Sequence, residues 1–477
     1  MVNLEKVRFL CYDNLENVLK VNGESIMKRK IYQDLLNWKS EWAGRYALLI
    51  NGARRVGKSY IVEEFARAEY KSYILLDFSK APVEVKELFD QFLSDLDTFF
   101  LYLTNITGVK LYERETLIIF DEVQLFPQAR AAVKHLVADG RYDYIETGSL
   151  ISIKENVKDI VIPSEEQHIY MHPMDFEEFL WALGDDMLYP FIQDCYANMR
   201  PLGQVLHKKA MNYFRQYMVV GGMPQAVEAY VQTKDFEEVD MIKRSILKLY
   251  TNDINKHAQR YATKVRSIFE EIPSQLSKQD KKFKLASLRK GARMRDYEDA
   301  LFWLSDSMIV NNCYNTTEPN IGLKLNMERI TLKSYMADTG LLISHTFDEK
   351  GLVSEEIYRR LLTGRLEVNQ GMLAENIVAQ MLVSAGHKLF FYSNKAREDS
   401  ESRMEIDFLL ARSKIERRHN ISPIEVKSGK RYTLSSIRKF QKKYEKYLHT
   451  AYVLHQKDLY VDEGIVYLPI YMTALLN

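Results

Sequence analysis

The stretch that decides the fold reads NGARRVGKSY and covers Asn51–Tyr60. It follows the apolar run YALLI at residues 46–50, which is long enough for a buried strand. After it comes YIVEEFARAEY at residues 60–70, with apolar residues at helical spacing. A glycine-rich turn between a strand and a helix is the context that a phosphate-binding loop requires. The stretch therefore predicts such a loop.

Four residues of this stretch, Gly52, Gly57, Lys58 and Ser59, fit the pattern G-x-x-x-x-G-K-[ST]. The glycines let the backbone wrap closely around phosphates, so that consecutive N–H groups point inward. The dipole of the following helix contributes only about 0.3–1 kcal/mol at an exposed site. We therefore expect Lys58 to bind the β- and γ-phosphate oxygens and Ser59 to bind Mg²⁺. The alternative is an ordinary glycine-rich turn with a chance lysine. The predicted ATP-binding residues are Gly52, Ala53, Arg54, Arg55, Val56, Gly57, Lys58, Ser59 and Tyr60.

A second element is the apolar run TLIIFDEVQ, which ends in Asp121 and Glu122. An acid at the carboxyl end of a parallel strand, next to the phosphate loop, can hold the hydration shell of Mg²⁺. A second carboxylate beside it can polarise the attacking water. We therefore predict Asp121 as a metal-binding residue, Glu122 as the catalytic base and Lys58 as a third catalytic group. The alternative is an acidic helix start before PQARAAVKHLV.

A third strand, YDYIE, ends in Thr147, Gly148 and Ser149. A hydroxyl at this position can sense the γ-phosphate, and we assign Ser149 to the nucleotide site. Serine, threonine and glycine also simply form turns, which is the competing interpretation.

Composition places the chain among globular proteins of more than one domain. It has 477 residues, 46% apolar and 27% charged, and a net charge of +1, so no global field attracts nucleic acid or membrane. The three cysteines lie far apart, which argues against a zinc cluster or a disulfide framework. No apolar run approaches the roughly 20 residues of a membrane span. A cytoplasmic location without membrane contact is the resulting expectation.

The pattern of predicted strands and helices divides the chain into three regions. Residues 1–183 alternate strand-like runs with helical patterns, which predicts an α/β domain with a mostly parallel sheet. Residues 184–330 are mainly helical, and residues 331–477 return to α/β texture with LFFYSN, MEIDFLLA, SPIEVKSG and TAYVLH. The segment VVGGMP in the helical region predicts a tight corner between helices.

The motifs GARRVGKS, LIIFDEVQ, ETGSL and HPMDFEEFL resemble those of AAA-type ATPases of the archaeal-ATPase-like group. The later segments YMVVGGMPQAV, YMADTGLL, GMLAENIVAQML and PIEVKSGK are similar to the same group. The resemblance covers nearly the whole chain. It implies a P-loop ATPase domain that uses ATP and Mg²⁺, then a winged helix, then a restriction-endonuclease-like PD-(D/E)xK domain.

The middle region fits the winged helix that the resemblance implies. RSIFEEIPSQLSK, LASLRKGA and MRDYEDALFWLSDSMIV read as three helices, and MIVNNCYN and IGLKLN as a hairpin. A basic patch falls within this region and could meet DNA phosphates. The alternatives are a solvated face or a surface for a protein partner. The patch consists of Lys278, Lys281, Lys282, Lys284, Arg289, Lys290, Arg293 and Arg295.

The C-terminal region carries a D…ExK pattern in EIDFLL and PIEVKSG. Glu425 and Lys427 project from one strand face, Asp407 is expected opposite, and Glu375 is expected to approach from a helix. Carboxylates that hold Mg²⁺ beside a lysine can support phosphodiester hydrolysis. These residues are the predicted second Mg²⁺ site. Whether the region cuts stays open, because nuclease-like folds also serve as binding scaffolds.

Two functions follow from these patterns. The favoured one is an ATPase whose nucleotide state is coupled to two C-terminal modules that engage DNA. The alternative is a nucleotide-gated switch or scaffold with an inert nuclease-like domain that binds protein partners.

Overall fold

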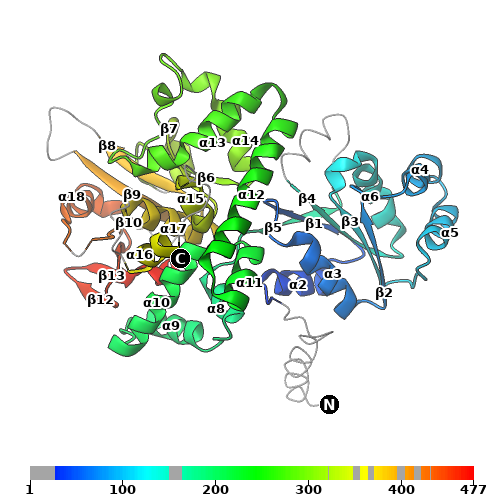
Figure 1. The fold of residues 1–477 in the computed structure, drawn as a ribbon, viewed down its shortest axis with the longest axis horizontal. Helices are drawn as coiled ribbons and strands as arrows, with labels where there is room; N and C mark the ends of the chain where they lie inside the picture. Colours follow the sequence, from blue (N-terminus) through cyan, green and yellow to red (C-terminus); the bar gives the residue numbers. More distant parts are fainter. Residues whose placement is uncertain are drawn as a thin grey trace. The chain divides into compact units, whose positions relative to one another are not determined.

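The structure is a computed structural model, which divides into two compact units, Met1–Met171 and His172–Asn477 (Figure 1). Each unit contains its own β-sheet. The residues that the structure describes are 27–149, 164–320, 322–347, 355–363, 370–394, 403–412, 420–429 and 431–476.

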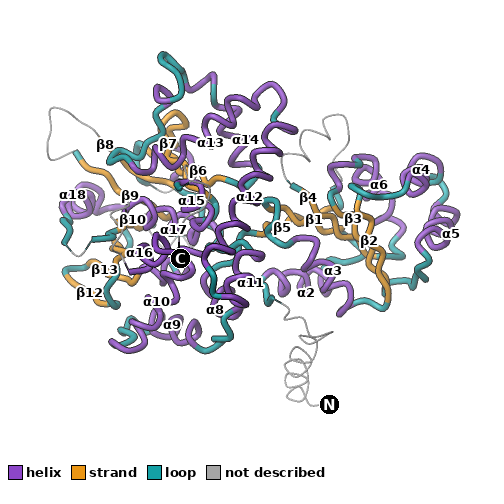
Figure 2. The backbone as a smooth tube through the Cα atoms, in the orientation of Figure 1, coloured by secondary structure: helices purple, strands orange, loops and turns teal. Residues whose placement is uncertain are grey.

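The first unit is built on five parallel strands in the order β2-β3-β4-β1-β5 (Figure 2). The three strands in the middle of this order, β3, β4 and β1, are buried along their whole length. Such continuous burial is typical of parallel strands that are covered on both faces. The predicted parallel α/β sheet is confirmed. The strands are Ala47–Gly52 (β1), Ser72–Asp77 (β2), Thr116–Asp121 (β3), Asp143–Gly148 (β4) and Glu166–Met171 (β5).

Helices cover both faces of this sheet. On one face Ile74, Phe120 and Tyr144 join an aromatic-rich core with side chains of α4, α5 and α6. Because successive strand residues point to opposite faces, their neighbours face α3, which packs on β1–β4. The helices are Ile31–Glu41 (α2), Lys58–Glu69 (α3), Val83–Gln91 (α4), Leu96–Thr107 (α5) and Pro127–Asp139 (α6).

The strand order brings the predicted site residues to one edge of the sheet. Strand β4 pairs with β1 through Asn51 and Gly148, and with β3 through Phe120 and Glu146. The carboxyl ends of β1, β3 and β4 are therefore adjacent, which is where parallel α/β sheets bind ligands.

The second unit begins with helices and continues into a mixed sheet. The helices before its sheet are Phe176–Ala182 (α8), Leu188–Ala197 (α9), Gln204–Val220 (α10), Pro224–Thr233 (α11), Phe236–His257 (α12), Ala262–Ser277 (α13) and Glu298–Asp306 (α14). The later ones are Thr339–Thr346 (α15), Glu355–Thr363 (α16), Gln370–Ser384 (α17) and Ser435–Tyr444 (α18).

Eight strands form this second sheet, in the order β12-β13-β11-β10-β9-β8-β6-β7. Its apolar residues form a core with Ile437 and Phe440 of α18. The strands are Val310–Thr316 (β6), Met327–Met336 (β7), Phe390–Asn394 (β8), Met404–Ala411 (β9), Ile421–Val426 (β10), Ala451–His455 (β11), Tyr460–Asp462 (β12) and Ile465–Pro469 (β13).

The predicted three helices and hairpin of the middle region are found in part. The helix expected over LASLRKGA is a single 3-10 turn, Leu285–Ser287. The strand expected over IGLKLN is also wrong: Leu323–Asn326 form a 3-10 turn, after Gly322 with a φ of 85°, and residue 321 lies outside the described residues. Strand β7 begins only at Met327. The hairpin of β6 and β7 also does not stand alone, since β6 pairs with β8 in the C-terminal part of the sheet.

The segment VVGGMP forms the predicted tight corner, between α10 and α11. The Gly222 N–H donates to Asp338 Oδ2 at 2.6 Å, and Met174 N–H donates to Gly222 O at 2.7 Å. A Cβ on Gly222 would collide with the backbone of Met174. Glycine is needed here because another part of the backbone occupies the space of a side chain.

We therefore expect Gly222→Ala to lower the free energy of unfolding by about 1–3 kcal/mol, the usual range for overpacking. The control is Gly429→Ala, because a Cβ at Gly429 would lie an ordinary 3.5 Å from Arg431 O. This control should stay within about 0.5 kcal/mol of wild type. Urea titration of the three proteins measures both effects. Equal unfolding free energies for Gly222→Ala and wild type would contradict the steric account.

Candidate functional site

The phosphate loop connects β1 to α3 through residues 53–57. Arg55 and Gly57 have positive φ values of 70° and 98°. Alternation of left-handed and ordinary backbone is the pattern by which successive N–H groups can converge on an anion. Gly52 meets a different need, because a Cβ there would lie 2.5 Å from Met171 O at the end of β5. The motif's two glycines thus serve close packing and a left-handed turn, respectively.

The Lys58 side chain folds back onto this loop. Its Nζ donates to Gly52 O at 2.9 Å and to Ala53 O at 3.1 Å, and the residue is only 8% exposed. Burial lowers the pKa of Lys58, while the Glu122 and Asp121 carboxylates act in the opposite direction. A cation in this position is suited to bind phosphate oxygens through charge-assisted hydrogen bonds.

Asp121, the last residue of β3, accepts hydrogen bonds from residues of α3 and β4. Ser59 Oγ donates to Asp121 Oδ1 at 2.7 Å, and the Thr147 hydroxyl donates to the same oxygen. Hydroxyl and carboxylate oxygens are ligands that Mg²⁺ prefers, and beside a nucleotide it needs only one or two carboxylates besides phosphates and water. This donor set therefore fits a nucleotide-bound Mg²⁺. Among the described residues, no three His, Cys, Asp or Glu side chains are arranged to hold a metal.

Glu122 follows β3 in a left-handed conformation, with φ 53° and ψ 45°. Such a conformation is uncommon for a residue with a Cβ, and it persists where the surroundings hold it in place. The Glu122 N–H donates to Thr147 Oγ1 at 3.4 Å, and the Gln124 side-chain amide donates to the Glu122 carboxylate. A half-buried carboxylate held beside Asp121 is able to orient a water molecule.

The other predicted residues lie in the loop, at the start of α3 and after β4. Arg54, Arg55 and Tyr60 are exposed, Val56 is buried, and Ser149 is half-buried directly after β4.

Two contacts at this site could not be predicted from any pattern in the sequence. One is the Gln124 amide on Glu122, described above. The other comes from Arg29, whose Nη1 donates to Val56 O at 2.8 Å across 27 residues. Neither residue belongs to the G-x-x-x-x-G-K-[ST] pattern, and no fixed spacing relates Arg29 to it.

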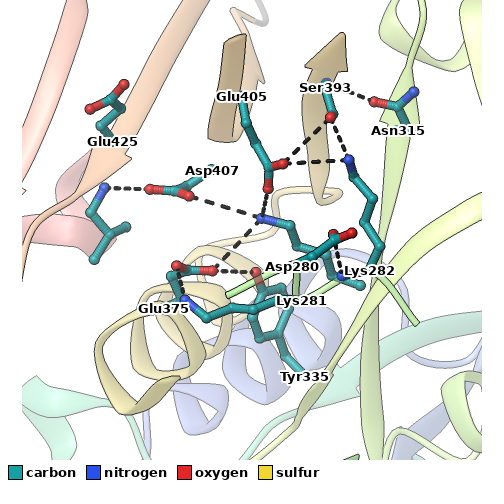
Figure 3. A network of polar contacts seen from close by, with 12 residues as sticks. Asp280, Lys281, Lys282, Asn315, Tyr335, Glu375, Ser393, Glu405, Asp407 and Glu425 are labelled. Atoms are coloured by element: carbon teal, nitrogen blue, oxygen red, sulfur yellow. Dashed lines mark hydrogen bonds and ion pairs between the residues drawn. The ribbon is translucent and has the colours of Figure 1, made fainter. Parts of the chain in front are cut away.

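Figure 3 shows the polar network around the predicted C-terminal carboxylates. Lys333 of β7 is 1% exposed and forms ion pairs with three acids of this network. Its Nζ is 2.9 Å from Glu405 Oε1, 3.8 Å from Glu375 Oε2 and 3.9 Å from Asp407 Oδ1. Burial alone would lower the pKa of Lys333, but these carboxylates raise it above its ordinary value. A lysine of the chain itself therefore balances the charge of these acids.

Other donors already hold two of the predicted carboxylates. Asp407 Oδ2 accepts from the Val426 N–H at 2.9 Å, and Glu375 accepts from Tyr335 at 3.1 Å and from Lys281. Burial and the charge of Glu375 raise the pKa of Asp407 to about 7.

Glu425 lies apart from this network (Figure 3). It is 2% exposed and pairs with Lys427, with 2.5 Å between Nζ and Oε2. Burial raises the pKa of Glu425, although Lys427 opposes the shift. The structure thus brings Glu375 and Asp407 to Lys333 and leaves Glu425 with Lys427. Within the ranges described above, these acids do not form a group of three that could hold a metal.

The predicted basic patch is divided by the same network. Lys281 and Lys282 point into it, with ion pairs to Glu375 and Glu405. Two more lysines pair with nearby acids, Lys278 with Glu271 and Lys284 with Asp280. Five cations of the patch are exposed, namely Lys284, Arg289, Lys290, Arg293 and Arg295, and Arg295 lies 3.8 Å from Asp296.

Comparison with known proteins assigns similarity to three parts of the chain. Residues 44–180 match the family described as an AAA domain. Residues 211–350 and 370–472 match two families that are each described as a domain of unknown function, DUF8612 and DUF4143. No curated protein sequence matches the chain.

Solved structures similar to the chain include a Walker-type ATPase of Pyrococcus abyssi, at 15% identity and a TM-score of 0.40, which covers 67% of this chain and 96% of that one. Drosophila ORC bound to DNA is similar at 12% identity and a TM-score of 0.26, covering 76% and 97%. Cdc6p from Pyrobaculum aerophilum is similar at 12% identity and a TM-score of 0.25, covering 74% and 99%.

The loop geometry and the match over residues 44–180 agree on the nature of the first unit. It contains a P-loop ATPase domain of the AAA type that binds nucleotide, and the protein is an ATPase. Among the helices that the structure describes, none has the length and apolar character needed to cross a bilayer.

Proposed function

We propose that the first unit hydrolyses ATP with Mg²⁺ and that its nucleotide state controls the second unit. Lys58 binds the β- and γ-phosphates, Glu122 orients the attacking water, and Ser149 senses the γ-phosphate. Ser59 and Asp121 hold Mg²⁺, which neutralises phosphate charge when bound. The observation that carries this proposal is the 2.7 Å contact between Ser59 and Asp121 beside the buried Lys58.

For the second unit, we propose a module that binds without cutting. The supporting observation is that Lys333 lies among Glu375, Glu405 and Asp407, where a nuclease would hold its metal. Together with Lys281 and Lys282, Lys333 brings three ammonium groups to these three carboxylates, so the negative charge that would attract a metal ion is already balanced by the chain itself. Under this proposal, the winged-helix and PD-(D/E)xK resemblances of the sequence concern the fold of this unit and not cleavage.

DNA is the proposed partner of this module. The supporting feature is the exposed group of Arg289, Lys290, Arg293 and Arg295, which suits phosphate contacts. A protein partner on the same surface is the alternative. The two differ in salt dependence, since affinity that rests on phosphate contacts falls steeply as salt rises.

One coupled assay tests both units. ATP turnover is measured with and without DNA, in Mg²⁺, in Mn²⁺ and in EDTA, and strand cleavage is scored in the same tube. We expect turnover that EDTA abolishes, and single- and double-stranded DNA that stays intact. No turnover in Mg²⁺ would refute the function of the first unit. Cleavage by wild type that Asp407→Asn abolishes would refute the non-cutting role.

A further inference from the structure

Arg29 contacts the phosphate loop from a distant part of the sequence. It lies just before α2, is 8% exposed, and donates from Nη1 to the carbonyl oxygen of the fully buried Val56. The contact is 2.8 Å long, a normal length for a charge-assisted hydrogen bond. An arginine that gives up water to bind a backbone oxygen constrains that oxygen strongly, because its charge is permanent.

The constraint on Val56 O extends to the next amide. In a trans peptide the C=O of one residue and the N–H of the next point in opposite directions. With Val56 O fixed toward Arg29, the Gly57 N–H points in the opposite direction within the same peptide plane. Gly57 otherwise has the widest backbone freedom of any residue type, and here its φ is 98°.

The loop is then held by cations at both ends. Lys58 binds Gly52 O and Ala53 O at its start, and Arg29 binds Val56 O at its end. Backbone concavities of this kind bind phosphate through their N–H groups, so holding Val56 O on Arg29 favours an anion at the Gly57 N–H.

We propose that Arg29 is a positioning residue of the ATPase: it orients the Val56–Gly57 peptide so that the Gly57 amide faces the nucleotide's phosphates. The proposal rests on the proposed function of the first unit and adds a residue outside the phosphate-loop motif. Arg29 acts through the loop and makes no contact with the reacting atoms.

The test compares Arg29→Gln, Arg29→Lys and wild type for binding of ATP, adenosine and inorganic tripolyphosphate by calorimetry. We expect Arg29→Gln to weaken the binding of ATP and of tripolyphosphate about 10- to 150-fold, the range for one hydrogen bond to a charged group. Affinity for adenosine should stay within about twofold, because adenosine has no phosphate. Arg29→Lys should recover part of the loss, since it keeps the charge and a donor without the planar fork.

Two controls separate the possible causes. Lys134→Gln removes the same charge from an exposed position on α6 and should bind all three probes like wild type. Lys58→Ala reports on the loop itself: if it binds ATP like wild type, the proposed function fails. If Lys58→Ala loses ATP while Arg29→Gln keeps wild-type affinity, only the positioning role is refuted. Equal losses for adenosine and ATP also refute it, as does Arg29→Lys no better than Arg29→Gln. If Arg29→Gln does not fold, the test relies on Arg29→Lys alone. The positioning role is then refuted if Arg29→Lys binds tripolyphosphate with wild-type affinity.

Discussion

Replacing Lys58 by alanine is expected to weaken ATP binding about 100-fold or more. Each hydrogen bond from a charged group contributes about 1.5–3 kcal/mol, which corresponds to roughly 10- to 150-fold in affinity. Lys58 is 8% exposed and sits against the loop carbonyls, so its ammonium is largely shielded from water when it meets phosphate. Calorimetric titration with ATP in Mg²⁺ measures the loss.

The buried side chain of Lys58 also packs within the loop, so the measurement needs a variant that keeps its volume. Lys58→Met removes the charge and retains most of the apolar stem, and we expect it to lose ATP as Lys58→Ala does. Lys134→Ala, which removes an exposed lysine from α6, is the matched control. Unfolding transitions of all three variants show whether the fold is intact. Wild-type affinity in a folded Lys58→Met protein would refute the predicted phosphate site.

Replacing Glu122 by glutamine is expected to leave ATP affinity within a few-fold of wild type and to lower kcat by about 10²–10⁴. A positioned general base contributes a factor of this size, and glutamine keeps the shape of the side chain but not its basicity. The Gln124 amide and the Thr147 hydroxyl hold this residue and its backbone, so the substitution leaves the turn's main-chain contact in place. Steady-state ATP turnover gives kcat, and an equilibrium titration gives the affinity.

Glu113→Gln, which neutralises an exposed acid just before β3, is the control and should retain wild-type kcat. A fall in both affinity and kcat would instead indicate that Glu122 shapes the nucleotide site. Unchanged turnover in Glu122→Gln would assign the role of base to another group.

The first unit's sheet was predictable because its chemistry lies within short contiguous stretches. NGARRVGKSY holds the turn glycines, the cation and the hydroxyl together, and TLIIFDEVQ carries its acids directly after a strand. Parallel strands end at one edge, so adjacency of Ser59 and Asp121 follows once the strands are recognised. To predict the contact of Thr147 with Asp121, one must also know that β4 lies between β1 and β3 in the sheet.

The second unit shows why other contacts were not predictable. Lys333 and Glu405 come from β7 and β9, which two further strands, β8 and β6, separate in the sheet order. Neither spacing nor alternation in a sequence specifies such an order. Counting charges also placed Lys281 and Lys282 on an outer surface, whereas both pair with acids of the network. Long side chains of this kind can turn inward wherever a buried carboxylate needs a partner.

The pairing of β6 with β8 decides how this protein can be dissected into fragments. Tyr314 and Asn315 face Phe390 and Phe391 across that pair, so one sheet runs from the middle of the chain to its C-terminal part. A fragment that starts near residue 331 would lack β6 and expose the edge of β8. Exposed edge strands promote aggregation. Recombinant work on the C-terminal portion is therefore best served by a piece that begins at His172, where the second unit starts.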